Sequence, residues 1–368
     1  MRLTKTSLAI LGVISLLALA EYFPHNWQTP IWPLLAATWL FLLFCEQTLL
    51  WFQKIKLERR LDRPLYLGTP TSVDYHLTNR DKYPVRLLTQ ELLPPTVTAK
   101  QNTLEWNLGA HESLTQSIRV TPLTLAPAPF SRIRLKILGR LALAWWTRDI
   151  PMPHTVDVLP EYRTTPTNTR HTPDVGTTLS RLRTYRSVTL VLNAGYLNQL
   201  VSGDLRRIDH YINACTRLAY RALNAHRTLN IIIYAKEIQL IMREVKTPTQ
   251  LGELFNRLQH DINADDAADH RCVFPQLDRI SQADLLVWYT DLDDADKNIE
   301  LAKMLTHYKQ RFDIQLYSLQ ASEAVILNEE LRIHRRHPYH QLEIRTLQHQ
   351  RRASREILQR AGIPVISA

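Results

Sequence analysis

Glycine and cysteine are both scarce in this sequence of 368 residues. Glycine occurs nine times, and neither G-x-x-x-x-G-K nor G-x-G-x-x-G is present, so we expect no loop of the kind that cradles phosphate groups. The three cysteines, Cys45, Cys215 and Cys272, lie far apart and form no C-x-x-C pair. This spacing predicts neither a disulfide framework nor a zinc site, which suits a reducing compartment.

Common catalytic motifs are missing as well. The sequence contains no G-x-S-x-G and no H-E-x-x-H. Basic residues outnumber acidic ones by 45 to 35, and the formal net charge is +10. This surplus suits nucleic acid, an anionic membrane surface or an acidic partner. The arginines near the C-terminus have no interleaved aromatic residues and lie in no recognisable nucleic-acid module. We therefore expect no specific nucleic-acid partner and favour inner-membrane lipids.

Two apolar stretches near the N-terminus predict a membrane anchor. Residues 8–20 follow Arg2 and Lys5, so this stretch is either a short transmembrane helix or a cleaved signal peptide. Residues 31–52 are long enough to span a bilayer. Three tryptophans flank this second stretch, as interfacial anchors would: Trp27, Trp32 and Trp51. Basic residues follow at 54–60, which by the positive-inside rule predicts that this end is cytoplasmic. We favour an uncleaved first helix, and hence two membrane spans.

Glu46 lies inside the second apolar stretch, next to Gln47. A carboxylate within a membrane span is by default a functional candidate. Glu46 is only about two helical turns from the cytoplasmic end, however. We therefore predict that it snorkels to the interface or pairs with a neighbouring helix.

The periodicity then changes to two. Over residues 61–160, apolar positions such as Val73, Tyr75 and Leu77 alternate with polar ones, and proline-rich turns separate the short runs. This pattern predicts a small antiparallel β-sandwich. Residues 161–186 are rich in threonine, proline, asparagine and arginine without periodicity, and predict a linker.

Residues 187–368 predict an α/β domain. Residues 188–192 form a short, β-branched apolar run, which predicts a buried strand. The helix that follows has an apolar stripe at three- and four-residue spacing, comprising Ile208, Tyr211, Ile212, Cys215, Leu218, Ala219, Ala222 and Leu223. A second buried strand is predicted at 285–289, and a basic, solvated or membrane-facing helix at 341–361. Ligands in such sheets bind at the carboxyl ends of the strands.

Several segments resemble one known family. They are Arg207-Ile208-Asp209-His210, Asn213-Ala214, Leu218-Ala219-Tyr220 and Thr290-Asp291-Leu292. These residues resemble the domain-of-unknown-function 58 family, which comprises bacterial membrane proteins with a von Willebrand factor A-like domain. The expected fold is two N-terminal transmembrane helices, a small antiparallel β-sandwich and an α/β von Willebrand A-like (Rossmann-like) domain. We expect residues 1–60, 61–160 and 187–368 to form these three parts, with both C-terminal domains cytoplasmic.

The resemblance also implies a metal site, but a degenerate one. The family's domain holds Mg²⁺ through a D-x-S-x-S loop, a threonine and a later aspartate. The loop positions here are Asn193, Gly195 and Leu197, and only Asp291 keeps its type, with Asp293 nearby. Mg²⁺ requires hard oxygen ligands in near-octahedral geometry. We therefore expect no cofactor, Mg²⁺ included, and a capping role for the two aspartates on the following helix is the simpler interpretation.

The absence of a catalytic set favours a binding or scaffold protein. The resemblance implies a partner, a MoxR-type AAA+ ATPase that acts in the assembly or activation of other proteins. We expect the contact surface at residues 193–197 and 291–294, with Tyr196 as an anchor. Two alternatives remain: a metal-assisted hydrolase that uses Asp291 with carboxylates from 264–269, and a basic protein that binds nucleic acid or anionic lipid.

Overall fold

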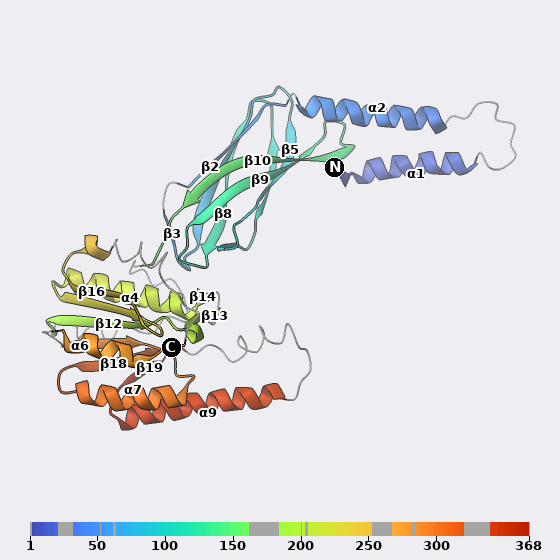
Figure 1. Cartoon of the computed structure of the whole chain (residues 1–368). Helices are drawn as coiled ribbons and strands as arrows, with labels where there is room; N and C mark the ends of the chain where they lie inside the picture. The colour runs from blue at the N-terminus through green and yellow to red at the C-terminus, as the bar shows by residue number, and fades with distance from the viewer. Residues whose placement is uncertain are drawn as a thin grey trace. The chain divides into compact units, whose positions relative to one another are not determined.

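The chain divides into two compact units, which are described separately. A computed structural model describes residues 2–20, 32–51, 53–61, 64–161, 184–199, 201–202, 205–251, 267–280, 284–319 and 339–367 (Figure 1). The N-terminal unit comprises Met1–Pro64, Pro70–Thr121 and Ala128–Asp157. The C-terminal unit comprises Leu65–Thr69, Pro122–Pro127 and Val158–Ala368. Most of the predicted linker (162–183) and part of the predicted acidic loop (264–266) lie outside the described residues. The predicted domain boundaries at residues 60, 160 and 186 stay predictions.

The predicted fold class is wrong. Among the described residues, α2 (Trp32–Trp51) alone is long and apolar enough to cross a membrane. Helix α1 (Lys5–Ala20) has 16 residues, which gives about 24 Å at 1.5 Å per residue, less than the roughly 30 Å of a bilayer core. The rest of the chain is rich in strands, many of them in antiparallel sheets, and does not reduce to a transmembrane pair followed by a von Willebrand A-like domain.

The strands of the N-terminal unit form two antiparallel sheets. The first has the order β1 (Arg2–Leu3), β10 (Ala144–Val156), β9 (Ala128–Leu138), β5 (Val85–Glu91) and β7 (Thr103–Leu108). The second has the order β2 (Ile55–Arg60), β4 (Thr71–Asn79), β8 (Ser113–Pro122) and β6 (Val97–Ala99). The predicted alternation is confirmed in β4, where Val73, Tyr75 and Leu77 are buried and the residues between them are not. Apolar residues therefore line the inner face, as the two-residue period of a strand requires.

A buried charge pair lies inside this unit. Arg59 Nη1 donates to Glu91 Oε1 over 2.8 Å, and the hydroxyl of Tyr75 donates to Glu91 Oε2 over 2.7 Å. Both charged side chains are almost fully buried. Burial raises the pKa of Glu91 above its ordinary value, although Tyr75 and Arg59 act in the opposite direction. These bonds connect β2 to β5 across the two sheets and compensate the buried carboxylate.

Glu46 fixes α2 to the sandwich. Its carboxylate accepts hydrogen bonds from the backbone N–H groups of Leu141, Leu143 and Ala144 and from the indole of Trp146, over 3.0 to 3.3 Å. The predicted snorkelling or pairing with a helix is therefore wrong, because the partner is the turn between β9 and β10. Gly139 belongs to the same contact, since a Cβ there would lie 1.9 Å from Glu46 Cδ.

The C-terminal unit is built on a six-stranded sheet. Its order is β16 (Ile238–Val245), β15 (Thr228–Tyr234), β12 (Ser187–Asn193), β17 (Leu285–Tyr289), β18 (Asp313–Ser318) and β19 (Val365–Ser367). All neighbouring strands are parallel except β16, which runs antiparallel to β15. Two small pairs complete the strands: β3 (Leu65–Tyr66) with β11 (Val158–Leu159), and β13 (Val201–Ser202) with β14 (Leu205–Arg206).

Helices cover this sheet on both faces (Figure 1). They are α4 (Arg207–Asn224), α6 (Phe274–Asp278), α7 (Ala295–Tyr308), α9 (Tyr339–Arg360) and the 3₁₀ turns η1 (Tyr196–Gln199) and η2 (His270–Val273). The predicted stripe of α4 is confirmed as buried, and so are the predicted strands at 188–192 and 285–289. A single apolar cluster joins β12, β15, β17 and β18 to α6, α7 and α9. The sheet is therefore buried on both faces, as parallel sheets are.

The Glu46 contact yields a stability prediction. Replacing Glu46 with alanine leaves three backbone donors and one indole N–H without their acceptor, and we expect a loss of about 2–4 kcal/mol in the free energy of unfolding. The measurement is denaturant unfolding of the full chain in detergent. Thr48→Ala on the same helix is the control, because its hydroxyl bonds only to the carbonyl of Phe44 among the described residues. Equal stability of the two variants would contradict the role assigned to Glu46.

Candidate functional site

The candidate site lies where β12 and β17 end. Asn193 is the last residue of β12, and Thr290 and Asp291 follow β17 directly. Because these two strands are parallel neighbours, their carboxyl ends meet at one edge of the sheet. Asn193 Nδ2 donates to Thr290 Oγ1 over 2.9 Å and to Asp291 Oδ2 over 3.3 Å. The structure thus brings together two of the residues that the sequence singled out.

The side-chain amide of Asn193 has a defined orientation. Its Oδ1 accepts a hydrogen bond from the backbone N–H of Gly195 over 2.8 Å, so its NH₂ group faces Asp291. Asn198 adds a second amide, which donates to the carbonyl of Asn193 over 3.0 Å and to Asp291 Oδ2 over 3.4 Å. One oxygen of the Asp291 carboxylate therefore receives two amide donors from the loop after β12.

Asp291 is buried, and its second oxygen is also engaged. Oδ1 accepts from the backbone N–H of Asp293 over 3.3 Å. Burial, and next the negative charge of Asp293, raise the pKa of Asp291 to about 6, while Arg207 lowers it. The carboxyl is thus held by donors of the protein itself rather than directed toward solvent.

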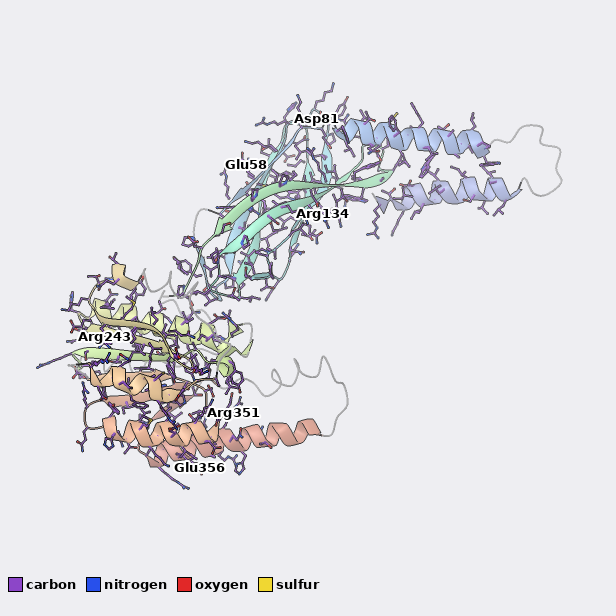
Figure 2. All side chains as sticks on the ribbon, viewed as in Figure 1. Glu58, Asp81, Arg134, Arg243, Arg351 and Glu356 are labelled. Atoms are coloured by element: carbon purple, nitrogen blue, oxygen red, sulfur yellow. The ribbon has the colours of Figure 1, made fainter. Side chains whose placement is uncertain are left out.

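Asp293 is clamped between two arginines. Arg207 Nη1 donates to Asp293 Oδ2 over 2.5 Å, and Arg351 Nε donates to Asp293 Oδ1 over 2.5 Å. Arg207 is fully buried on the first turn of α4, and Arg351, labelled in Figure 2, is 8% exposed on α9. Burial by itself raises the pKa of Asp293, but the two guanidinium groups outweigh it and lower the pKa below its ordinary value. Charge-assisted bonds of this kind are the strong ones in a protein interior.

The sequence analysis did not identify Arg207 or Arg351 as residues of the site. Arg207 begins the helix after β12, so it lies at the same edge of the sheet as Asn193, and that position was the available signal. Arg351 belongs to the predicted basic helix, which was expected to be solvated or membrane-facing. That expectation is wrong for Arg351, because it is buried against Asp293. The predicted capping role of Asp291 and Asp293 is also wrong: Asp294 caps α7 by accepting from the N–H of Lys297 over 3.1 Å.

The remaining predicted residues line a small hollow above this network. Its walls are Asn193, Gly195, Tyr196, Leu197, Ala268, His270, Asp291, Asp294, Lys297 and Asn298. Gly195 is required by close approach, since a Cβ there would lie 2.9 Å from the backbone nitrogen of Ala268. Leu197 is half-buried, whereas Tyr196 is 49% exposed. Tyr196 is thus the large apolar side chain that this loop presents to solvent.

These residues do not fit the Mg²⁺ site that the resemblance implied. Asn193 turns its NH₂ group, not its oxygen, toward Asp291, and Gly195 and Leu197 have no side-chain oxygen. Both oxygens of Asp293 already accept from guanidinium groups. Two arginine charges face the two carboxylates, so no net negative charge is left to favour a divalent cation. Within the described ranges, no group of three or more histidine, cysteine, aspartate or glutamate side chains is arranged to hold a metal.

Comparisons with known proteins add little to this geometry. No family model and no curated protein matches the chain. The CARDB domain of the PF1109 protein from Pyrococcus furiosus matches with a TM-score of 0.21 and 15% identity, over 30% of this chain and 96% of that chain. A FixG-related protein from Vibrio parahaemolyticus matches with a TM-score of 0.20 and 10% identity, over 28% of this chain and 95% of that chain. At such scores neither likeness bears on the function.

The arginine clamp predicts a sharp contrast between two neighbours on α9. Arg351→Met removes one of two partners of a buried carboxylate, and we expect a loss of about 2–3 kcal/mol in unfolding free energy, less than for removal of a sole partner. Arg352→Met changes an exposed side chain, and we expect a change within about 0.5 kcal/mol. Chemical denaturation of both variants measures this. Similar losses in the two would argue against the clamp.

Asp291 predicts a pH dependence of known sign. Its folded pKa lies above the ordinary value, so the folded state binds the proton more tightly and this stabilisation is lost as pH rises through about 6. Relative to Asp291→Asn, the wild type should lose about 2 kcal/mol of stability between pH 4.5 and 7.5. Denaturation curves of both proteins at these two pH values provide the test. A difference that does not change with pH would show that the carboxyl is not perturbed.

Proposed function

We propose that this protein is a membrane-anchored, non-catalytic interaction or scaffold protein that binds a partner through the loops after β12 and β17. The observation that carries this proposal is the clamp of Arg207 and Arg351 on Asp293. Donors from the protein occupy the carboxylate oxygens of Asp291 and Asp293 at this edge of the sheet, and the neighbouring Tyr196 is left half exposed.

The loop after β12 suits recognition because hydrogen bonds of two asparagine side chains stabilise its conformation. Asn193 and Asn198 bind backbone groups of the loop itself and the carboxylate of Asp291. A preformed loop loses little conformational entropy when a partner binds. An aromatic residue on such a loop is a typical interface anchor, since a few buried aromatic residues carry most of the binding energy of many interfaces.

The hydrolase alternative receives no support from the same geometry. Its key residue, Asp291, has both oxygens occupied by Asn193, Asn198 and the N–H of Asp293. His270 lies at the hollow, but its Nδ1 is 2.7 Å from the hydroxyl of Tyr234, and burial lowers the pKa of His270 to about 4. A ring held in this way is a core histidine rather than a general base poised near neutral pH.

The partner and the compartment complete the proposal. The resemblance to the domain-of-unknown-function 58 family implies a MoxR-type AAA+ ATPase as the partner of the Tyr196 surface. We assign α2 as the anchor in a bacterial inner membrane, and its apolar length supports this. Lys54 and Lys56 follow its C-terminal end, so the positive-inside rule favours a cytoplasmic sandwich and α/β unit. We assign no cofactor.

A binding measurement tests the partner. Full-length protein in detergent is immobilised and titrated with a purified MoxR-type ATPase from the same organism, and we expect Tyr196→Ala to weaken the affinity at least tenfold. Tyr83→Ala is the matched control, because Tyr83 is also exposed but belongs to the N-terminal unit. No binding by the wild type would end the partner proposal. Equal weakening by both variants would remove Tyr196 as the anchor.

A further inference from the structure

A cleft opens in the N-terminal unit beside the end of α2. It lies between β2, which is the edge strand of one sheet, and β10 of the other. Its volume is about 720 Å³, within the range of small-molecule sites. Its walls include the apolar Leu50, Leu57, Ile137 and Trp146 and the charged Lys56, Arg148 and Asp149. The cleft therefore combines apolar walls with charged groups, among them Arg148 from a central position of β10.

Arg148 is an exposed residue of β10, and its register places it on the same sheet face as buried residues of β9. In the pairing of β10 with β9, Arg148 is opposite Leu135, and the next positions on the same face pair Trp146 with Ile137 and Ile150 with Ile133. Side chains directly opposite in an antiparallel pair lie on the same face. Leu135, Ile137 and Ile133 are buried. The exposed guanidinium therefore lies between Trp146 and Ile150, which are partly buried on the same face.

Arg148 has no acidic ion-pair partner among the described residues. The adjacent Asp149 also lines the cleft, but it pairs with Arg134 over 3.0 Å and with Arg132 over 3.7 Å. No salt bridge of Arg148 is found in the part of the chain that the structure describes. An unneutralised guanidinium at the opening of an apolar cleft is complementary to a ligand that carries both a negative group and a hydrocarbon chain.

A second polar group in the cleft lacks a partner. Gln53 follows α2 and is 7% exposed, and its Oε1 has no hydrogen-bond partner among the described residues. A buried acceptor without a donor is costly. A hydroxyl group of a bound ligand would supply the missing donor.

We infer that the cleft binds one anionic phospholipid with a hydroxyl-bearing headgroup, such as phosphatidylglycerol, from the bilayer around α2. The guanidinium of Arg148 binds the phosphate, Gln53 accepts from the headgroup hydroxyl, and an acyl chain lies against Trp146, Ile137 and Leu50. Trp51 ends α2 and is largely exposed, the position of an interfacial residue beside lipid headgroups. This inference rests on the proposed anchoring by α2.

Native mass spectrometry of the full chain tests the inference. The detergent-solubilised protein is titrated with phosphatidylglycerol and with phosphatidylcholine of the same acyl chains. We expect one tightly bound phosphatidylglycerol, at least tenfold preferred over phosphatidylcholine. Arg148→Gln should lower this preference to about threefold or less, and Gln53→Leu should weaken phosphatidylglycerol binding several-fold. Arg119→Gln is the matched control, because it removes the same charge from a position on β8 that is also exposed but does not line the cleft.

Other outcomes overturn the inference. Equal effects of Arg148→Gln and Arg119→Gln would mean that net charge, not the cleft, attracts lipid. Displacement of the lipid by millimolar inorganic phosphate would assign the site to a free anion. An unchanged lipid preference in Arg148→Gln would leave the arginine as a charge that only protects the strand edge. Unfolding curves establish whether each variant is folded. If Arg148→Gln is not folded, Arg148→Lys, which retains the charge, replaces it in the titration.

A membrane extraction assay separates this failure from failure of the anchor. If carbonate releases the wild-type protein from membranes, the anchoring by α2 is wrong, and the lipid inference fails with it. If the protein stays membrane-integrated but shows no preference that depends on Arg148, only the lipid inference fails.

Discussion

The clamp on Asp293 is the interaction on which the C-terminal unit depends. A carboxylate buried at the end of a parallel sheet is tolerable only with partners, because the desolvation cost of an isolated charge is several kcal/mol. Arg207 supplies one partner from the first turn of α4, and Arg351 supplies the other from α9. Two helices far apart in the sequence are thereby fixed to the same strand end. The loop at Asn193 is connected to this arrangement through Asp291, which accepts hydrogen bonds from both Asn193 and the backbone N–H of Asp293.

The N-terminal unit also contains a buried carboxylate, but a different set of donors stabilises it. Glu46 is a buried carboxylate on an apolar helix, and backbone amides and an indole, rather than a cation, satisfy it. The two carboxylates therefore differ in what they connect: Asp293 holds helices to a sheet, whereas Glu46 holds a helix to a turn. In both cases a single acidic residue joins elements that lie far apart in the sequence.

The sequence predicts the features that depend on neighbouring residues, but it does not predict the pairs that form between distant residues. The apolar run at 188–192, the stripe of α4 and the alternation in β4 each depend on neighbours along the chain, and each is confirmed. The fold class failed because α1 is too short to count as a span and because the sheets prevail over the helices. The burial of Arg351 could not be predicted from the sequence, because its partner Asp293 lies 58 positions away. Nothing in the sequence of a basic helix indicates which arginine faces the interior.

The distance in sequence between clamp partners has a consequence for synthesis of the chain. Ribosomes add roughly 5–20 residues per second, so Arg351 emerges several seconds after Asp293, and the β9–β10 turn emerges similarly late after Glu46. During these intervals each carboxylate exists without its full set of partners. A nascent chain stalled before α9 would carry a half-compensated charge at the carboxyl end of its sheet, and quality-control proteases would unfold that intermediate more easily than the finished protein.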